Sequence, residues 1–155
     1  MQISTDNKDI VTIILQWTDR NILVASVYIP SCTSDKEGDE QQLASYMQEI
    51  QRVIEREKTI SPELEILVAG DFNRHDSLWG GPQVALEQRQ GEGTKITEFI
   101  EHNGLQLLTQ RGMVTWERNE QKSTIDLMMA SEKLSEDMIK CKIWDNEYGL
   151  SLIHI

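Results

Sequence analysis

The chain has 155 residues, of which 39% are hydrophobic and 26% are charged, and its formal net charge at pH 7 is −11. This length and composition are typical of one globular domain with its own core. The charge argues against an autonomous nucleic-acid binder, because neutralising phosphates takes a basic surface and the sequence shows no stripe of lysine and arginine. Any grip on nucleic acid is therefore expected to come mainly from segments outside this chain.

No apolar stretch is long enough to cross a bilayer, and the first residues lack a secretory pattern. Cys32 and Cys141 stand far apart, without a C-x-x-C pair or a histidine cluster. We therefore expect reduced thiols and no zinc site. Together these features predict an intracellular protein, nuclear or cytoplasmic, with no membrane partner.

Two strands joined by a polar turn are predicted near the start of the chain. Residues 11–17 and 21–28 are rich in aliphatic and β-branched side chains, and the polar residues 18–20 separate them, which indicates a hairpin. Pro30 closes the second strand. Apolar residues then recur at helical spacing across residues 39–58, which predicts an amphipathic helix.

The second half of the chain is predicted to hold shorter elements. The polar, glycine-rich residues 80–93 indicate an irregular surface loop, and a short helix is expected to end at Asn103 and Gly104. Short strands are predicted at residues 105–108, 113–116, 124–129 and 139–144. Strands and helices alternate irregularly, so the pattern alone predicts mixed sheets with helices outside them.

The most informative stretch is residues 66–73, which read Ile-Leu-Val-Ala-Gly-Asp-Phe-Asn. The apolar run predicts a strand buried on both faces, and Gly70 frees the backbone to turn. Asp71 and Asn73 are two apart, so their side chains can reach one cleft. A carboxylate there can bind a hard cation or accept a proton from water, and an asparagine can donate to a phosphate oxygen. The alternative is a plain strand end closed by an Asx turn.

Residues 71–81 read Asp-Phe-Asn-Arg-His-Asp-Ser-Leu-Trp-Gly-Gly and resemble the signature of the endonuclease/exonuclease/phosphatase superfamily. The Trp-Gly-Gly ending is similar to the branch formed by endonuclease domains of non-LTR retrotransposons. Residues 24–30 resemble the family's strand with an active-site tyrosine, here Tyr28. Residues 123–129 resemble its late strand with an aspartate, here Asp126. The three matches follow the family's order, and the resemblance as a whole runs over about residues 10–149.

The resemblance implies an α/β fold, the four-layer α/β/β/α sandwich of two mixed sheets seen in DNase I-like proteins, incomplete here at both ends. It implies a parent domain that is a phosphodiesterase or DNA endonuclease dependent on Mg²⁺, with Mn²⁺ as an alternative. A reverse transcriptase is expected to follow in the same polypeptide. Two other interpretations remain open: a phosphatase of small phosphate esters or lipids, and a non-catalytic remnant.

By this resemblance, Asp71 would orient and deprotonate the attacking water, and Asn73 would hold the phosphate. Both are candidate metal ligands. Tyr28 would donate a hydrogen bond to a phosphate oxygen, and Asp126 would fix the tautomer of a histidine. On the residues alone, Tyr28 also fits a core edge with its hydroxyl in water. Asp126 lies in an apolar strand and needs a partner, because a buried carboxylate is costly without one.

Arg74 and His75 are candidate substrate-binding residues beside this site. For Arg74 the competing interpretations are a phosphate contact and plain surface. For His75 a solvent-facing loop position competes with a general base and is favoured over it, because the family does not place its catalytic histidine there. Trp79 is expected to pack this loop against the core.

The family pattern breaks at both ends of the chain. The early asparagine and the metal-binding glutamate are absent in role, and the late Ser-Asp-His triplet is missing. Residues 150–155 read Leu-Ser-Leu-Ile-His-Ile, the in-frame translation of the transposon end CTGTCTCTTATACACATCT used in sequencing libraries. We therefore expect a partial domain over residues 1–149 and a non-native tail after it, with decay of a mobile element as the alternative. His154 is then not a catalytic histidine, and the fragment is expected to be inactive.

Overall fold

The computed structural model describes residues 1–31, 35–86, 89–138, 142–144 and 152–154. Within these residues the chain forms a six-stranded sheet with helices against it, and two further sheets of two strands each. All six candidate site residues lie in the described part. The boundary expected after residue 149 lies outside it, so the interpretation of residues 150–155 as a tail stays a prediction.

The predicted hairpin is present. Strands β2 (Ile10–Gln16) and β3 (Asn21–Tyr28) pair antiparallel over their whole lengths. The short strand β1 (Gln2–Ile3) extends the sheet on the outer side of β2. Along β3, buried residues alternate with less buried ones toward the strand's end, as expected where only one face is covered. The hairpin therefore supplies one side of the sheet and ends at Tyr28.

The predicted amphipathic helix is also present and is slightly longer than expected. Helix α1 (Lys36–Ile60) carries the chain from the end of β3 to the start of β4 (Glu65–Asp71). Because α1 is a crossover connection, β3 and β4 run parallel. Both strands therefore end at the same edge of the sheet, where Tyr28 and Asp71 are the last paired residues.

Shorter elements follow, and some differ from prediction. They are α2 (Ser77–Gly80), α3 (Gln83–Leu86), α4 (Thr94–Asn103), β5 (Leu105–Leu107), β6 (Trp116–Arg118), β7 (Gln121–Ser123), β8 (Asp126–Ser131), α5 (Glu132–Asp137), β9 (Lys142–Trp144) and β10 (Leu152–His154). The loop expected at residues 80–93 contains short helical turns. The strand expected at residues 113–116 is wrong, because pairing begins only at Trp116, where the β6–β7 hairpin starts. Of the strand expected at residues 139–144, the first three residues lie outside the described part.

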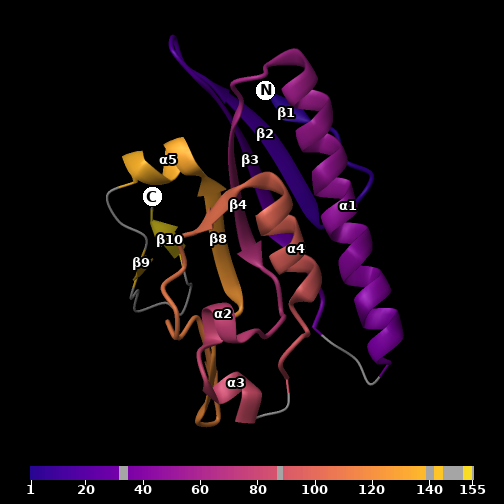
Figure 1. The fold of residues 1–155 in the computed structure, drawn as a ribbon, viewed down its shortest axis with the longest axis vertical. Coiled ribbons are helices and arrows are strands. Elements are labelled where there is room, and N and C mark those ends of the chain that lie inside the picture. Colours follow the sequence, from indigo (N-terminus) through magenta and orange to yellow (C-terminus); the bar gives the residue numbers. More distant parts are fainter. Residues whose placement is uncertain (32–34, 87–88, 139–141, 145–151, 155) are drawn as a thin grey trace.

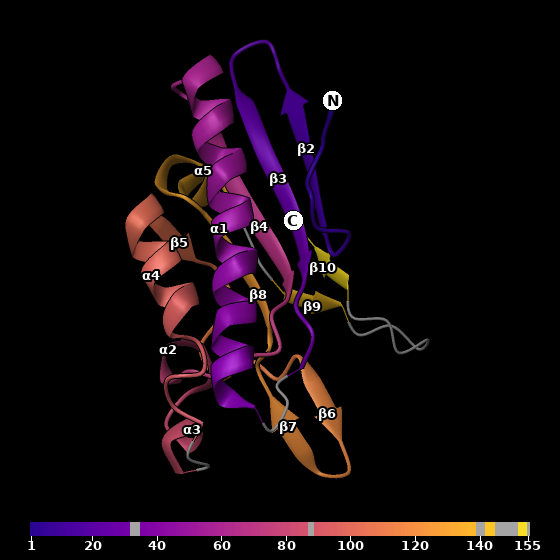
Figure 2. The ribbon, with the colours of Figure 1, turned by 90° about the vertical axis from the view of Figure 1, so that its right-hand side faces the viewer.

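The main sheet is mixed, with strand order β1-β2-β3-β4-β8-β5. Only β3 and β4 run parallel, and every other neighbouring pair in this sheet is antiparallel. Figure 2 shows α1 and α4 together on one face of this sheet, with β9 and β10 on the opposite side. The described residues thus contain one complete helix-on-sheet layer pair.

The larger core cluster lies between the sheet and helices α1 and α4. It includes alternate residues of the central strands, such as Val27, Val68 and Leu127. The other face holds a smaller cluster in which Leu67 and Met128 pack with Leu134 of α5. A strand residue that does not point into the larger core therefore points toward the opposite face.

No helix in the described part of the chain is both long enough and apolar enough to span a bilayer.

Gly70 is required where β3 and β4 approach most closely. A Cβ on Gly70 would lie 1.9 Å from the backbone oxygen of Val27. We expect Gly70→Ala to lower the free energy of unfolding by about 3 kcal/mol or more, because backbone must move to relieve the clash. Gly112→Ala is the control: its φ is 77° but a Cβ there meets no atom within 4 Å. It should cost about 1–2 kcal/mol. Equal losses for both variants in urea denaturation would contradict this assignment.

Candidate active site at the ends of three strands

Three predicted site residues form one row across neighbouring strands. Tyr28 is the register partner of Asp71 in the β3–β4 pair, and Asp71 is the register partner of Asp126 in the β4–β8 pair. Their sequence neighbours Val27, Phe72 and Leu127 point into the larger core. The row therefore faces away from α1, since side chains alternate along a strand. The structure brings together residues that are nearly one hundred positions apart in the sequence.

Asp71 lies in an environment that disfavours its charge. Partial burial raises the pKa of Asp71, and the neighbouring carboxylate of Asp126 raises it further, to about 6. Hydrogen bonds from Asn73 act in the opposite direction but are weaker. A carboxylate with a pKa near neutrality is well suited to exchange a proton with water.

Asp126 is also partly buried, and burial raises its pKa above the usual value. The side chain of Thr115 counteracts this rise by hydrogen bonding to it. The Thr115 hydroxyl also accepts the backbone N–H groups of Ile125 at 2.9 Å and of Asp126 at 3.0 Å. The partner that a buried aspartate requires is therefore present.

Thr115 is a site residue that the sequence did not reveal. It lies in the stretch predicted as a strand, and a single threonine beside a tryptophan carries no signal of its own. In the structure it precedes β6 and fixes the start of β8. Only the return of the β6–β7 hairpin brings it beside Asp126.

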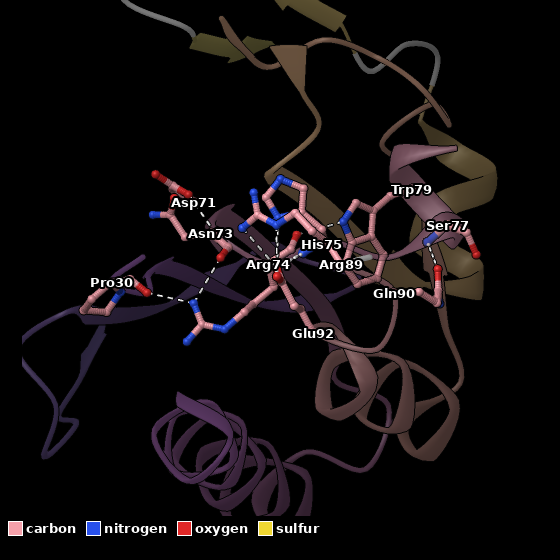
Figure 3. Close-up of polar contacts among 10 residues, drawn as sticks. All are labelled: Pro30, Asp71, Asn73, Arg74, His75, Ser77, Trp79, Arg89, Gln90 and Glu92. Carbon is pink, nitrogen blue, oxygen red and sulfur yellow. Dashed lines mark hydrogen bonds and ion pairs between the residues drawn. The ribbon is translucent and has the colours of Figure 1, made fainter. Parts of the chain in front are cut away.

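Asn73 adopts a left-handed conformation, with φ of 46°. Its backbone N–H donates to Asp71 Oδ1 at 3.0 Å, which forms the Asx turn expected if the segment were a plain strand end. Its side-chain Nδ2 donates to the carbonyl oxygen of Ile29 at 3.0 Å. The Asx turn and the site thus coexist, and the turn aims the amide at the end of β3 (Figure 3).

Arg74 and His75 are buried, which corrects the surface interpretations of both. Arg74 is 1% exposed, and its Nη1 donates to the carbonyl oxygens of Pro30 at 2.8 Å and Asn73 at 3.0 Å. His75 is 8% exposed, and its Nδ1 lies 3.1 Å from Glu92 Oε2. Nothing in the sequence indicated this burial, since Glu92 contacts His75 from 17 residues away and Arg74 turns back to Pro30. Substrate binding by either residue stays a prediction.

Trp79 packs the loop against the core, as predicted. It is fully buried in the larger cluster, and its indole Nε1 donates to the carbonyl oxygen of Arg74 at 3.1 Å. A Cβ at Gly93 would lie 2.3 Å from the Trp79 ring, so the start of α4 is packed directly on the indole. This contact fixes the segment that follows Asn73.

A hollow of about 580 Å³ is bordered by Asn73 and Ile125, which are close in sequence to Asp71 and Asp126, but by none of the three row residues themselves. Its lining includes Asn73 and His75 from the turn after β4, and Trp116 and Lys122 from the β6–β7 hairpin. Arg89 adds a second cation to this lining. Polar and cationic groups therefore border the site on the hairpin side, although the whole chain is acidic.

The donor set fits a Mg²⁺ ion in part. Mg²⁺ is commonly held by one or two carboxylates together with phosphate oxygens and water. The candidate ligands Asp71 and Asn73 supply one carboxylate and one amide oxygen, and a cation beside them would relieve the repulsion between Asp71 and the neighbouring Asp126. Within the described residues no group of three or more His, Cys, Asp or Glu side chains could enclose a metal ion. The row is thus compatible with a metal that is shared with substrate.

The raised pKa of Asp71 gives a sign for the pH dependence of stability. Its ordinary value is 3.8 and its folded value is about 6, so the folded chain retains a proton that the unfolded chain releases. The contribution of Asp71 to stability is therefore greatest below pH 3.8 and falls as the pH rises to about 6. We expect Asp71→Asn to lose less stability than the wild type over this interval in urea denaturation. An identical pH profile for both proteins would contradict the assignment.

Asp126→Asn tests the cause of this shift. Removing the neighbouring negative charge should lower the Asp71 pKa from about 6 while burial keeps it above 3.8. Carboxyl ¹³C NMR titration measures the change. An Asp71 pKa that does not move would show that the two carboxylates do not interact.

A known family matches most of the chain. The sequence profile of a family described as endonuclease–reverse transcriptase matches residues 22–151, a span that contains all six predicted site residues. No curated protein sequence matches the chain closely enough to count as a relative.

Three solved structures are similar to the chain to different degrees. The endonuclease domain of TRAS1, a telomere-specific non-LTR retrotransposon, matches with a TM-score of 0.64 at 19% identity, over 87% of this chain and 56% of that one. An endonuclease/exonuclease/phosphatase family protein from Leptotrichia buccalis C-1013-b has a TM-score of 0.45 at 15% identity, over 79% of this chain and 42% of that one. The catalytic domain of human Nocturnin, with bound sulfate, has a TM-score of 0.45 at 14% identity, over 79% and 40%.

The first of these structural matches, together with the family profile, confirms the predicted α/β, DNase I-like fold and the predicted superfamily. The chain spans about half the length of the solved structures that it matches. The described residues accordingly form only part of the four-layer sandwich.

Proposed function

We propose that this chain, which belongs to the endonuclease–reverse transcriptase family, supplies the central part of a Mg²⁺-dependent site that cleaves phosphodiester bonds in DNA. The observation that carries the proposal is the row of Tyr28, Asp71 and Asp126 on three neighbouring strands. A tyrosine hydroxyl and two carboxylates, one with a pKa of about 6, face the same side of the sheet. If these strand ends had no function, nothing would explain why two partly buried carboxylates, which cost free energy, lie side by side.

The chemistry assigned to each residue follows from its atoms. Asp71, when ionised, accepts the proton of the attacking water, and its pKa of about 6 leaves it largely ionised at neutral pH. Tyr28 is 52% exposed at the strand end, and its hydroxyl donates a hydrogen bond to a phosphate oxygen. The Asn73 amide, whose orientation the Ile29 carbonyl fixes, positions the phosphate. Asp126 orients a histidine that the parent polypeptide supplies from outside this chain.

Asp71 and Asn73 would hold the Mg²⁺ ion, and Mn²⁺ could replace it. A bound cation would supply positive charge beside the phosphate as negative charge develops on it. The raised pKa of Asp71 supports this assignment, because a carboxylate disfavoured in its charged form gains most from a neighbouring cation.

A paramagnetic probe tests the metal assignment on this chain. Mn²⁺ should broaden the NMR signals of Tyr28, Asp71 and Asn73 first, and excess Mg²⁺ should restore them. Asp71→Asn should abolish the selective broadening, because it removes the anionic ligand. Broadening centred instead on the acidic first turn of α1, at Glu37 and Asp39, would refute the assignment.

The 155-residue chain alone is expected not to cleave DNA. Its described residues bring two carboxylates to the row, and the glutamate and histidine that complete the family's site have no counterpart here. In a supercoiled-plasmid assay with Mg²⁺, we expect no nicking above that of Asp71→Ala. Robust nicking that depends on Asp71 would show that the missing residues are dispensable.

A longer parent domain should nick the same plasmid, and Asp71→Ala should slow it by on the order of 10²–10⁴-fold, the usual effect of losing a general base. Release of phosphate from soluble esters with the plasmid left intact would favour the phosphatase interpretation. A parent inactive in both assays would favour the non-catalytic remnant.

The context proposed for the parent is a retrotransposon polypeptide in which a reverse transcriptase follows the nuclease domain. The family's description supports this context, as does the structural match to a retrotransposon endonuclease. The cut would leave a 3′ hydroxyl that primes reverse transcription. Because the chain carries a net charge of −11, we assign most of the affinity for DNA to other parts of the parent. An intracellular location, nuclear or cytoplasmic, stays a prediction.

A further inference from the structure

We infer that Arg74 is a positioning residue, which holds the turn that carries Asn73 against the end of the strand that carries Tyr28. The sequence suggested a phosphate contact or a surface position for this arginine. The structure instead buries its side chain and directs one guanidinium nitrogen at two backbone carbonyl groups (Figure 3). The inference takes its functional meaning from the proposed nuclease site.

The contacts of Arg74 continue the β3–β4 pairing beyond the strands. The ladder ends where Tyr28 faces Asp71, and the Ile29 N–H then donates to the Asp71 carbonyl oxygen at 2.8 Å. Asn73 Nδ2 returns a bond to the Ile29 carbonyl oxygen at 3.0 Å. Arg74 Nη1 donates to the carbonyl oxygen of the next residue, Pro30, at 2.8 Å. Side chains thus extend the pairing by two residues where backbone pairing has stopped.

The same Nη1 donates to the Asn73 carbonyl oxygen at 3.0 Å. One rigid, planar group therefore ties Pro30 on one side to Asn73 on the other. The Trp79 indole holds the Arg74 carbonyl oxygen at 3.1 Å, so the backbone that carries the guanidinium is itself fixed. Asn73 itself has a left-handed φ of 46°, which asparagine adopts more readily than most residues other than glycine.

Arg74 is a destabilising residue at this buried position unless it serves a further purpose. Its Nη2 is buried without a hydrogen-bond partner, and no carboxylate among the described residues lies within ion-pair distance of it. Burying a charged group without a paired opposite charge costs free energy. The cost is explained if the guanidinium is kept for the geometry that it imposes on the two strand ends.

Amide hydrogen exchange on the intact chain tests the inference. In Arg74→Met we expect exchange of the Ile29 N–H and of the Asn73 side-chain amide to rise at least tenfold. Exchange of Val68 and Leu127 amides in the sheet should stay within twofold, because the core is unchanged. Arg111→Met is the matched control: its Nε donates to the Ser77 carbonyl oxygen at 2.8 Å but does not join the strand ends. It should alter neither group.

Unchanged exchange at Ile29 and Asn73 would overturn the inference. A uniform rise across the sheet would also overturn it, because it would show a merely stabilising residue. If Arg74→Met does not fold, the same inference is tested on the wild type. NMR scalar couplings between Arg74 Nη1 and the carbonyl carbons of Pro30 and Asn73, transmitted through the two hydrogen bonds, should be present. Their absence would refute the inference. These measurements contain neither DNA nor metal, so their failure is distinct from failure of the nicking assay.

Discussion

The pairing of β4 with a neighbour on each side is the constraint on which the rest of the site depends. Parallel pairing with β3 places Tyr28 beside Asp71, and antiparallel pairing with β8 places Asp126 on the other side. A slip of one residue in either ladder would turn a site side chain into the core, because strand side chains alternate. The core residues on the α1 face therefore determine where the polar row lies.

The row is electrostatically unfavourable, and the surrounding structure compensates for it. Burial raises the pKa of both Asp71 and Asp126, and the neighbouring charge of Asp126 raises that of Asp71 further. Hydrogen bonds from Asn73 and Thr115 offset part of this cost. Donors from turn and hairpin, and not from the strands themselves, support the acids. Destabilising arrangements of this kind concentrate at functional sites, where bound ligands relieve them.

The sequence predicted those elements and residues whose signals are local. Alternation revealed the hairpin, helical spacing revealed α1, and the Asp-Phe-Asn strand end located Asp71 and Asn73. Thr115 and the burial of Arg74 and His75 escaped prediction, because they depend on contacts between segments far apart in the chain. The strand expected at residues 113–116 failed for a related reason: Met113 and Thr115 bond to residues 124–126 through the side chains of Thr124 and Thr115 instead of pairing as a strand.

The crossover topology also sets the order in which the site can assemble. Tyr28 and Asp71 can meet once α1 and β4 have been synthesised, whereas Asp126 joins only after β8 has emerged. Closing such long segments is slow compared with forming local contacts. A nascent chain on the ribosome therefore carries an unfinished row until more than four fifths of these 155 residues exist.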